Sequence, residues 1–176
     1  MKRSFQALGC KLNQYETEAL ATRFQEAGYT IVPFEDPADI IVINTCTVTN
    51  KADRKSKNLL NRAIRSGEQK KPVIASGWSA PAVDTLQERS LNSLVVLTGC
   101  FVDSHKNELE KAGRIMVIDN DGKSSLFEQV DAFVKGEIFS RDSVHADRFA
   151  YNQAERLFHT RATLKIQDGW DNFCTF

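Results

Sequence analysis

Apolar residues recur along the chain with two spacings, which predict strands and helices in alternation. Short runs rich in β-branched residues, such as "IIVINT" and "LVVLTG", are typical of strands buried on both faces of a parallel sheet. Between them lie amphipathic segments that end in glycine, such as "NQYETEALATRFQEAG". We expect strands at 4–9, 29–34, 40–45, 71–77, 93–99 and 114–119, and helices at 13–28, 50–67, 81–91, 103–113 and 123–136.

Two of the expected helices carry more specific predictions. In 103–113, Asp103 or Ser104 is a suitable N-cap residue, because its side-chain oxygen can accept a hydrogen bond from the first turn. In 123–136 the apolar residues recur at helical spacing and predict one buried stripe. That stripe consists of Leu126, Val130, Phe133 and Val134.

The alternation of strands and helices predicts the fold class. It favours an α/β domain over 1–136, with an open, mostly parallel sheet of Rossmann or flavodoxin type and helices on both faces. Residues 137–161 are mixed and polar, and we interpret them as a linker. A new strand pattern at 163–166 indicates that residues 162–176 belong to a further domain.

Composition narrows the class of protein. The 176 residues contain 23 Lys and Arg against 23 Asp and Glu, so no overall basic excess points to nucleic acid. The apolar runs are too short to span a bilayer, and the N-terminus enters a predicted strand without a secretory signal. We therefore expect a cytoplasmic protein, whose four cysteines are more often metal ligands or catalytic groups than disulfides.

Three of the cysteines share one context. Cys10, Cys46 and Cys100 each follow a predicted strand, and the carboxyl ends of parallel strands meet at one edge of a sheet. The simplest interpretation is a non-catalytic binding domain in which the three thiols are buried and unreactive. A zinc-stabilised module is another, although no CxxC pair is present, and the histidines (His105, His145 and His159) do not follow strands. We favour an iron–sulfur cluster held by three thiolates, with one iron open to another ligand.

The segments around these cysteines resemble the methylthiotransferase family. "LGCKLNQYETEAL", "INTCTVTNKADRKSK" and "VVLTGC" are similar to its N-terminal domain, and the first two are most similar to the branch that acts on N6-threonylcarbamoyladenosine at position 37 of tRNA. The branches acting on isopentenyladenosine and on a ribosomal protein remain alternatives. The resemblance implies an auxiliary [4Fe-4S] cluster on Cys10, Cys46 and Cys100, in an enzyme that uses S-adenosylmethionine (SAM). It extends over 3–66, 94–119 and 162–176, whereas 72–93 looks like an insertion.

The last residues, "DGWDNFCTF", resemble the start of the family's CxxxCxxC motif, which holds a second [4Fe-4S] cluster. Cys174 matches the second cysteine of that motif, but Trp170 stands at the place of the first and the chain stops before the third. Tryptophan does not ligate iron. We therefore expect 162–176 to be the truncated start of a radical SAM barrel and the chain alone to be inactive.

Two further groups of residues have candidate binding roles. Asn13, Thr45 and Thr47 lie next to cysteines and could donate hydrogen bonds to cluster sulfurs, although Asn13 could equally cap a helix. The predicted helix after Cys46 carries a local positive patch that could contact tRNA phosphates or simply be a solvated face. The patch consists of Lys51, Arg54, Lys55, Lys57, Arg62 and Arg65.

Overall fold

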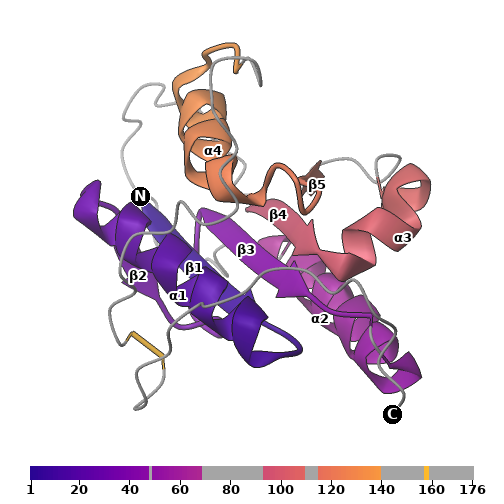
Figure 1. The fold of residues 1–176 in the computed structure, drawn as a ribbon. Helices are drawn as coiled ribbons and strands as arrows, with labels where there is room; N and C mark the ends of the chain where they lie inside the picture. The colour runs from indigo at the N-terminus through magenta and orange to yellow at the C-terminus, as the bar shows by residue number, and fades with distance from the viewer. Residues whose placement is uncertain (48, 69–92, 110–114, 140–156, 159–176) are drawn as a thin grey trace, which may run out of the picture.

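The chain folds around a single five-stranded sheet, seen in a computed structural model that describes residues 1–47, 49–68, 93–109, 115–139 and 157–158 (Figure 1). The strands are all parallel and lie in the order β2-β1-β3-β4-β5. Their bounds are β1 (Lys2–Ala7), β2 (Thr30–Val32), β3 (Ile40–Thr45), β4 (Leu94–Gly99) and β5 (Ile115–Val117). This is the flavodoxin-like order, so the predicted fold class is confirmed.

Helices cover both faces of this sheet (Figure 1). Side chains of α1 and α4 pack in one hydrophobic cluster, and those of α2 and α3 pack in another. The helices are α1 (Lys11–Glu26), α2 (Asn50–Glu68), α3 (Cys100–Leu109) and α4 (Leu126–Lys135), the last preceded by a 3-10 turn, η1 (Lys123–Ser125).

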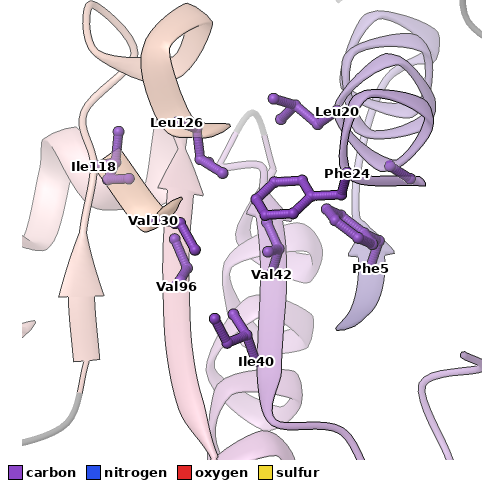
Figure 2. Packing of buried hydrophobic residues seen from close by; sticks show 10 residues of the cluster. Phe5, Leu20, Phe24, Ile40, Val42, Val96, Ile118, Leu126 and Val130 are labelled. Carbon is purple, nitrogen blue, oxygen red and sulfur yellow. The ribbon is translucent and has the colours of Figure 1, made fainter. Parts of the chain in front are cut away.

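The central strand β3 is buried over its whole length, as its continuous apolar run predicts. Because successive side chains of a strand point to opposite faces, Ile40 and Val42 enter the cluster beside α1 and α4. Ile41 and Ile43 enter the cluster beside α2 and α3. Figure 2 shows the first cluster, in which Phe24 lies over Val42 and beside Phe5.

Two local predictions were wrong. Helix α3 begins at Cys100 rather than at Asp103 or Ser104, and its backbone is non-helical at His105. On α4, Phe133 is 58% exposed, so it does not belong to the buried stripe. Leu126, Val130 and Val134 follow one another at four-residue spacing and take the inner face, while Phe127 packs against Phe24 with 4.9 Å between ring centroids.

Some predictions fall on segments outside the described residues. These are the strand at 71–77, the helix at 81–91, nearly all of the insertion at 72–93, and the barrel segment 162–176. Within the expected linker, Leu157 is described and packs against the cluster beside α1 and α4. None of the helices in the described part has the length and hydropathy needed to cross a membrane.

Candidate metal centre

The sheet brings Cys10, Cys46 and Cys100 to its carboxyl edge on three adjacent strands. Cys46 and Cys100 directly follow β3 and β4, and Cys10 follows β1 after two intervening residues. The chain moves outward in opposite directions from β1 and β3, and in open α/β sheets ligands bind beside such a switch point. In the described part of the chain none of the three cysteines forms a disulfide; Cys10 is exposed, Cys100 half-buried and Cys46 buried.

Gly9 allows the loop after β1 to lie directly on Cys46. Its φ is +115°, which a residue with a side chain rarely adopts, and a Cβ built on it would lie 2.3 Å from Cys46 Cβ and 2.9 Å from Cys46 Sγ. The glycine before Cys10 is therefore required both by the turn and by its contact with the second cysteine.

Gly99 has the same double role before Cys100. Its φ is +97°, and a Cβ built on it would lie 2.3 Å from the carbonyl oxygen of Thr45 on the neighbouring strand. The hydroxyl of Thr45 in turn donates a 2.6 Å hydrogen bond to the carbonyl oxygen of Thr98. The ends of β3 and β4 are thus held close together just before Cys46 and Cys100.

Helix α2 fixes the backbone of Cys46 from the other side. The hydroxyl of Ser56, which is fully buried, donates a 3.1 Å hydrogen bond to the carbonyl oxygen of Cys46. The start of α2 is capped by Thr49, whose hydroxyl oxygen accepts a 3.1 Å hydrogen bond from the backbone N–H of Ala52. These bonds position the segment between the second cysteine and the helix that follows it.

The thiol of Cys100 lies among several polar groups. Burial raises its pKa, and the nearby Cys46 thiol and Asp103 carboxylate act in the same direction. The ammonium group of Lys123 and a hydrogen bond with the Asn120 side chain oppose this rise in pKa. Asn120 is itself held in place by a 2.6 Å hydrogen bond from its amide to Asp103 Oδ2.

Two of the three cysteines lie at helix N-termini. Cys10 is the N-cap residue of α1, and Cys100 is the first residue of α3. Helix N-termini present unpaired backbone N–H groups and the positive end of the helix dipole, which stabilise thiolates and other anions. Three thiolates at such an edge match the soft ligands that iron–sulfur clusters require.

Among the described residues, no three His, Cys, Asp or Glu side chains are grouped so as to hold one metal ion. In a cluster each thiolate binds a different iron, so its ligands do not meet at one point. Among the residues that the structure describes, none forms a hydrogen bond with the buried hydroxyl of Thr98, which precedes Gly99 and Cys100.

The three residues predicted to donate to cluster sulfurs have different surroundings. The side-chain amide of Asn13 donates to the carbonyl oxygens of Leu8 and Thr45, each at 3.0 Å, and the hydroxyl of Thr45 is also engaged. Thr47 is half-buried beside Cys46. Asn13 is not a helix cap, because α1 begins two residues before it; it joins the loop after β1 to the end of β3.

Three features of this region were not predicted from the sequence. They are the buried ion pair between Glu16 and Lys123, the hydrogen bond from Ser56 to the backbone of Cys46, and the hydrogen bond from Asn120 to Asp103. Lys123 Nζ lies 2.8 Å from Glu16 Oε2, and the two residues are 107 positions apart in the chain. No local pattern links positions so far apart. The local signal was Glu16 itself, a charged residue in the first half of α1 whose sequence neighbours are mostly buried.

The basic residues of α2 lie on the surface. All six are exposed, and at 3.6 residues per turn Lys51, Lys55 and Arg62 share the face opposite the buried Leu60. Within the described part of the chain, two of the six are paired with acids: Lys57 lies 3.3 Å from Asp53, and Arg62 lies 2.8 Å from Glu35.

Of the remaining candidates, His105 lies on α3 and the others fall outside the described residues. His105 stacks on Phe101 of its own helix with 4.3 Å between ring centroids. Cys174, Trp170, His145 and His159 fall outside the described part of the chain.

Comparison with known proteins gives a consistent result. Residues 2–83 match the model of the uncharacterized protein family UPF0004. The chain is 34% identical to the threonylcarbamoyladenosine tRNA methylthiotransferase MtaB of Aquifex aeolicus, in an alignment covering 100% of the chain and 38% of the relative. The MtaB protein of Bacillus subtilis is 35% identical over 98% of the chain and 34% of its own length.

A second group of relatives is more distant. The tRNA-2-methylthio-N(6)-dimethylallyladenosine synthase of Thermotoga petrophila is 22% identical over 100% of the chain and 35% of its own length. The chain therefore spans little more than a third of the length of the relatives it matches.

Proposed function

We propose that the chain is the auxiliary-cluster part of a tRNA methylthiotransferase, which its match to UPF0004 over residues 2–83 and its similarity to the two MtaB proteins support. The complete enzyme adds a methylthio group to C2 of N6-threonylcarbamoyladenosine at position 37 of tRNA, in the cytoplasm. The observation that carries this proposal is the presence of Cys10, Cys46 and Cys100 after three adjacent strands of one sheet.

In this proposal the three thiolates hold a [4Fe-4S] cluster whose fourth iron stays open. That cluster supplies the sulfur for the methylthio group, while a second cluster with bound SAM supplies the radical chemistry. Other residues of this chain position the three ligands. Gly9 and Gly99 allow the three loops to approach one another, and Ser56 fixes the backbone of the middle ligand.

We assign residues 1–136 to this domain, 137–161 to a linker and 162–176 to the start of the radical SAM barrel. Cys174 corresponds to one cysteine of the barrel motif, and Trp170 stands where the motif has another. Since tryptophan cannot ligate iron, we expect the 176-residue chain alone to hold one cluster and to carry out no methylthiolation.

The proposed partner is tRNA. The exposed basic residues of α2 begin at Lys51, five residues after Cys46, so phosphate contacts on this helix would bring RNA near the cysteine edge. Lys51 and Lys55 are the strongest candidates, because Lys57 and Arg62 are already paired with acids.

Anaerobic reconstitution with iron and sulfide tests the cluster. The wild-type chain should become brown and contain about four irons and four sulfides, as one [4Fe-4S] cluster requires. Cys10→Ala, Cys46→Ala and Cys100→Ala should each lose most of the iron and the visible absorption. Cys174→Ala is the matched control and should keep both. A colourless wild type would favour the alternative of a non-catalytic binding domain with unreactive thiols.

Nucleoside analysis tests the reaction and its branch. Cells that lack the gene should accumulate N6-threonylcarbamoyladenosine and lose its methylthio derivative, measured by mass spectrometry of digested tRNA. Loss of the methylthio derivative of isopentenyladenosine would assign the chain to the other tRNA branch. Loss of a methylthio group from a ribosomal protein, with all tRNA nucleosides intact, would assign it to the protein-modifying branch.

A further inference from the structure

Two buried polar side chains are neighbours in the sheet just before its carboxyl edge. Asn44 on β3 and Thr98 on β4 are register partners, and both residues are fully buried. Two positions earlier on the same strands, Val42 and Val96 enter the cluster beside α1 and α4 (Figure 2). Because side chains alternate between the faces of a strand, Asn44 and Thr98 also lie on this face. They stand two residues before the cysteines that follow these strands.

The side-chain amide of Asn44 has a fixed orientation. Its nitrogen donates a 3.1 Å hydrogen bond to the carbonyl oxygen of Asn13 on α1. Since a carbonyl oxygen can only accept, the amide nitrogen and not the amide oxygen must point at α1. The oxygen, Oδ1, lies close to β4, because a Cβ built on Gly99 would be 2.7 Å from it. Gly99 directly follows Thr98, so the amide oxygen is directed towards the strand that carries the Thr98 hydroxyl.

Neither of these two oxygen atoms has a hydrogen-bond partner within the described part of the chain. This holds for Oδ1 of Asn44 and for the hydroxyl of Thr98. Buried polar groups without a partner are uncommon in folded proteins, because each has lost its hydrogen bonds to solvent and gained none. Two such groups at one register position indicate a shared partner that belongs to neither strand.

The spacing of the strands fits a single water molecule between the two groups. Neighbouring strands lie about 4.8 Å apart, so side chains in register on one face have a similar separation. Two hydrogen bonds of about 2.8 Å that meet at one water can span this gap. The water would donate to Asn44 Oδ1, which only accepts, while the hydroxyl of Thr98 can accept or donate. Buried waters commonly satisfy polar groups of this kind.

We propose that Asn44 and Thr98 form a buried binding site for one water molecule, which links β3 to β4 just before the cysteine edge. The hydroxyl of Thr45 already links these strands on the opposite face, through its bond to the carbonyl oxygen of Thr98. The water therefore joins the ends of the two strands on the second face. The site requires no metal ion, so its test does not depend on the proposed cluster.

A high-resolution crystal structure of the chain tests the site directly. The expected result is an ordered water within about 3.2 Å of both Asn44 Oδ1 and Thr98 Oγ1. The same analysis of Thr98→Val should show this water lost, while the amide of Asn44 keeps its bond to Asn13. A wild-type structure with no water between the two oxygens would overturn the proposal.

Urea unfolding of Thr98→Val gives a second test, through the sign of the effect. Valine has a similar shape and at least as high a strand propensity, so replacing an unpaired hydroxyl would leave stability unchanged or raise it. If the hydroxyl instead holds a bridging water, the substitution also removes a partner from Asn44. We then expect the unfolding equilibrium constant to rise about tenfold. Unchanged or higher stability of Thr98→Val would contradict the bridging water.

Ser4→Ala is the matched control for this measurement. The hydroxyl of Ser4 is also fully buried and has no partner among the residues that the structure covers. Its register partners on the two neighbouring strands, Val32 and Ile41, are apolar and offer no second group for a water to bridge. Removing this hydroxyl should therefore cause no loss of stability.

A double-mutant cycle with Asn44→Ala shows whether the two groups share one partner. In the Asn44→Ala background, Thr98→Val should raise the unfolding constant much less than it does alone, because the bridge is already broken. Equal effects of Thr98→Val in both backgrounds would show that the two oxygens act independently, and the proposal would fail. If a variant does not fold, the wild-type crystal structure still decides.

Discussion

Gly9 lies so close to Cys46 that a Cβ on the glycine would sit 2.3 Å from the cysteine's own Cβ. The two residues are neighbours because β1 and β3 pair in parallel, with Ala7 opposite Asn44 near their carboxyl ends. The first proposed ligand, Cys10, is therefore positioned by a glycine that packs on the second. Any side chain added at residue 9 must move one of the two cysteine loops.

Gly9→Ala tests this contact. We expect it to destabilise the folded chain by roughly 2–5 kcal/mol, the sum of a strained backbone and an overfilled space. It should also reduce the iron bound on reconstitution. Thermal unfolding of the chain without iron, followed by iron analysis, measures both effects.

Gly28→Ala is the matched control for that variant. Gly28 also has a positive φ, +84°, but a Cβ there would have nothing within 4 Å. The cost should be limited to about 1–2 kcal/mol of backbone strain, with normal iron content. Equal losses in the two variants would show that the contact with Cys46 contributes nothing.

Thr45→Val tests the bond between the ends of β3 and β4. Thr45 is fully buried, and its hydroxyl donates at 2.6 Å to the carbonyl oxygen of Thr98. Valine keeps the shape but leaves that carbonyl without this donor, so we expect a loss of about 1–3 kcal/mol in urea unfolding. Thr17→Val is the control, because its buried hydroxyl donates at 2.7 Å to the carbonyl oxygen of Asn13 one turn earlier in α1, and a loss well below that of Thr45→Val is expected.

Asp131→Asn tests a pH-dependent contribution on α4. Hydrogen bonds from Lys135 and Tyr29 lower the pKa of Asp131 below its usual value of 3.8. The stability that this carboxylate contributes is therefore present above pH 3.8 and is lost as the pH falls through the lowered pKa. At neutral pH the variant should be less stable by about 0.5–1 kcal/mol, since its partner Lys135 is 55% exposed and solvent screens the pair.

Urea unfolding at a series of pH values measures this difference between Asp131→Asn and the wild type. It should shrink towards zero below pH 3.8. Tyr29→Phe removes the 2.5 Å hydrogen bond that the Tyr29 hydroxyl donates to Asp131. Its stability should differ from that of the wild type by less than that of Asp131→Asn, with the same pH dependence. A difference that is constant with pH would contradict the role of the charge.

Lys51→Ala with Lys55→Ala tests RNA binding by α2. Both side chains are exposed on one face of the helix. If each contacts a phosphate, tRNA affinity should fall, and the dependence of log K on log salt should become shallower by about 0.7–0.9 per lost contact. Fluorescence anisotropy with labelled tRNA over a range of salt concentrations measures both. Lys2→Ala, at the opposite end of the sheet, should change neither.

Most of the fold was predictable because its signals are local. The run "IIVINT" requires burial on both faces, and β3 is buried throughout. Helix ends were harder to predict. Helix α3 starts at Cys100, directly after β4, and cysteine is not one of the residue types that mark a helix N-terminus. Phe133 was misplaced because it lies at the margin of the stripe, where a small rotation of the helix decides exposure.

The candidate site was predictable only in part. The carboxyl ends of parallel strands lie at one edge of a sheet, so the sequence was enough to predict that the three cysteines share that edge. The contacts that shape the edge join residues far apart in the chain, such as Glu16 with Lys123 and Asn13 with Thr45. Such pairs depend on how α1 lies on the sheet, and no repeating pattern encodes them.

Neither hydrophobic cluster in the described part of the chain includes a cysteine. The side chains that unite the sheet and its helices are in place without any contribution from a ligand at the carboxyl edge. Small zinc domains differ, because their metal supplies the folding energy. If the proposed cluster binds at this edge, we expect the chain to fold first and to take up iron and sulfide on an already folded surface. Oxidative loss of such a cluster should then leave a folded protein that can bind a new one.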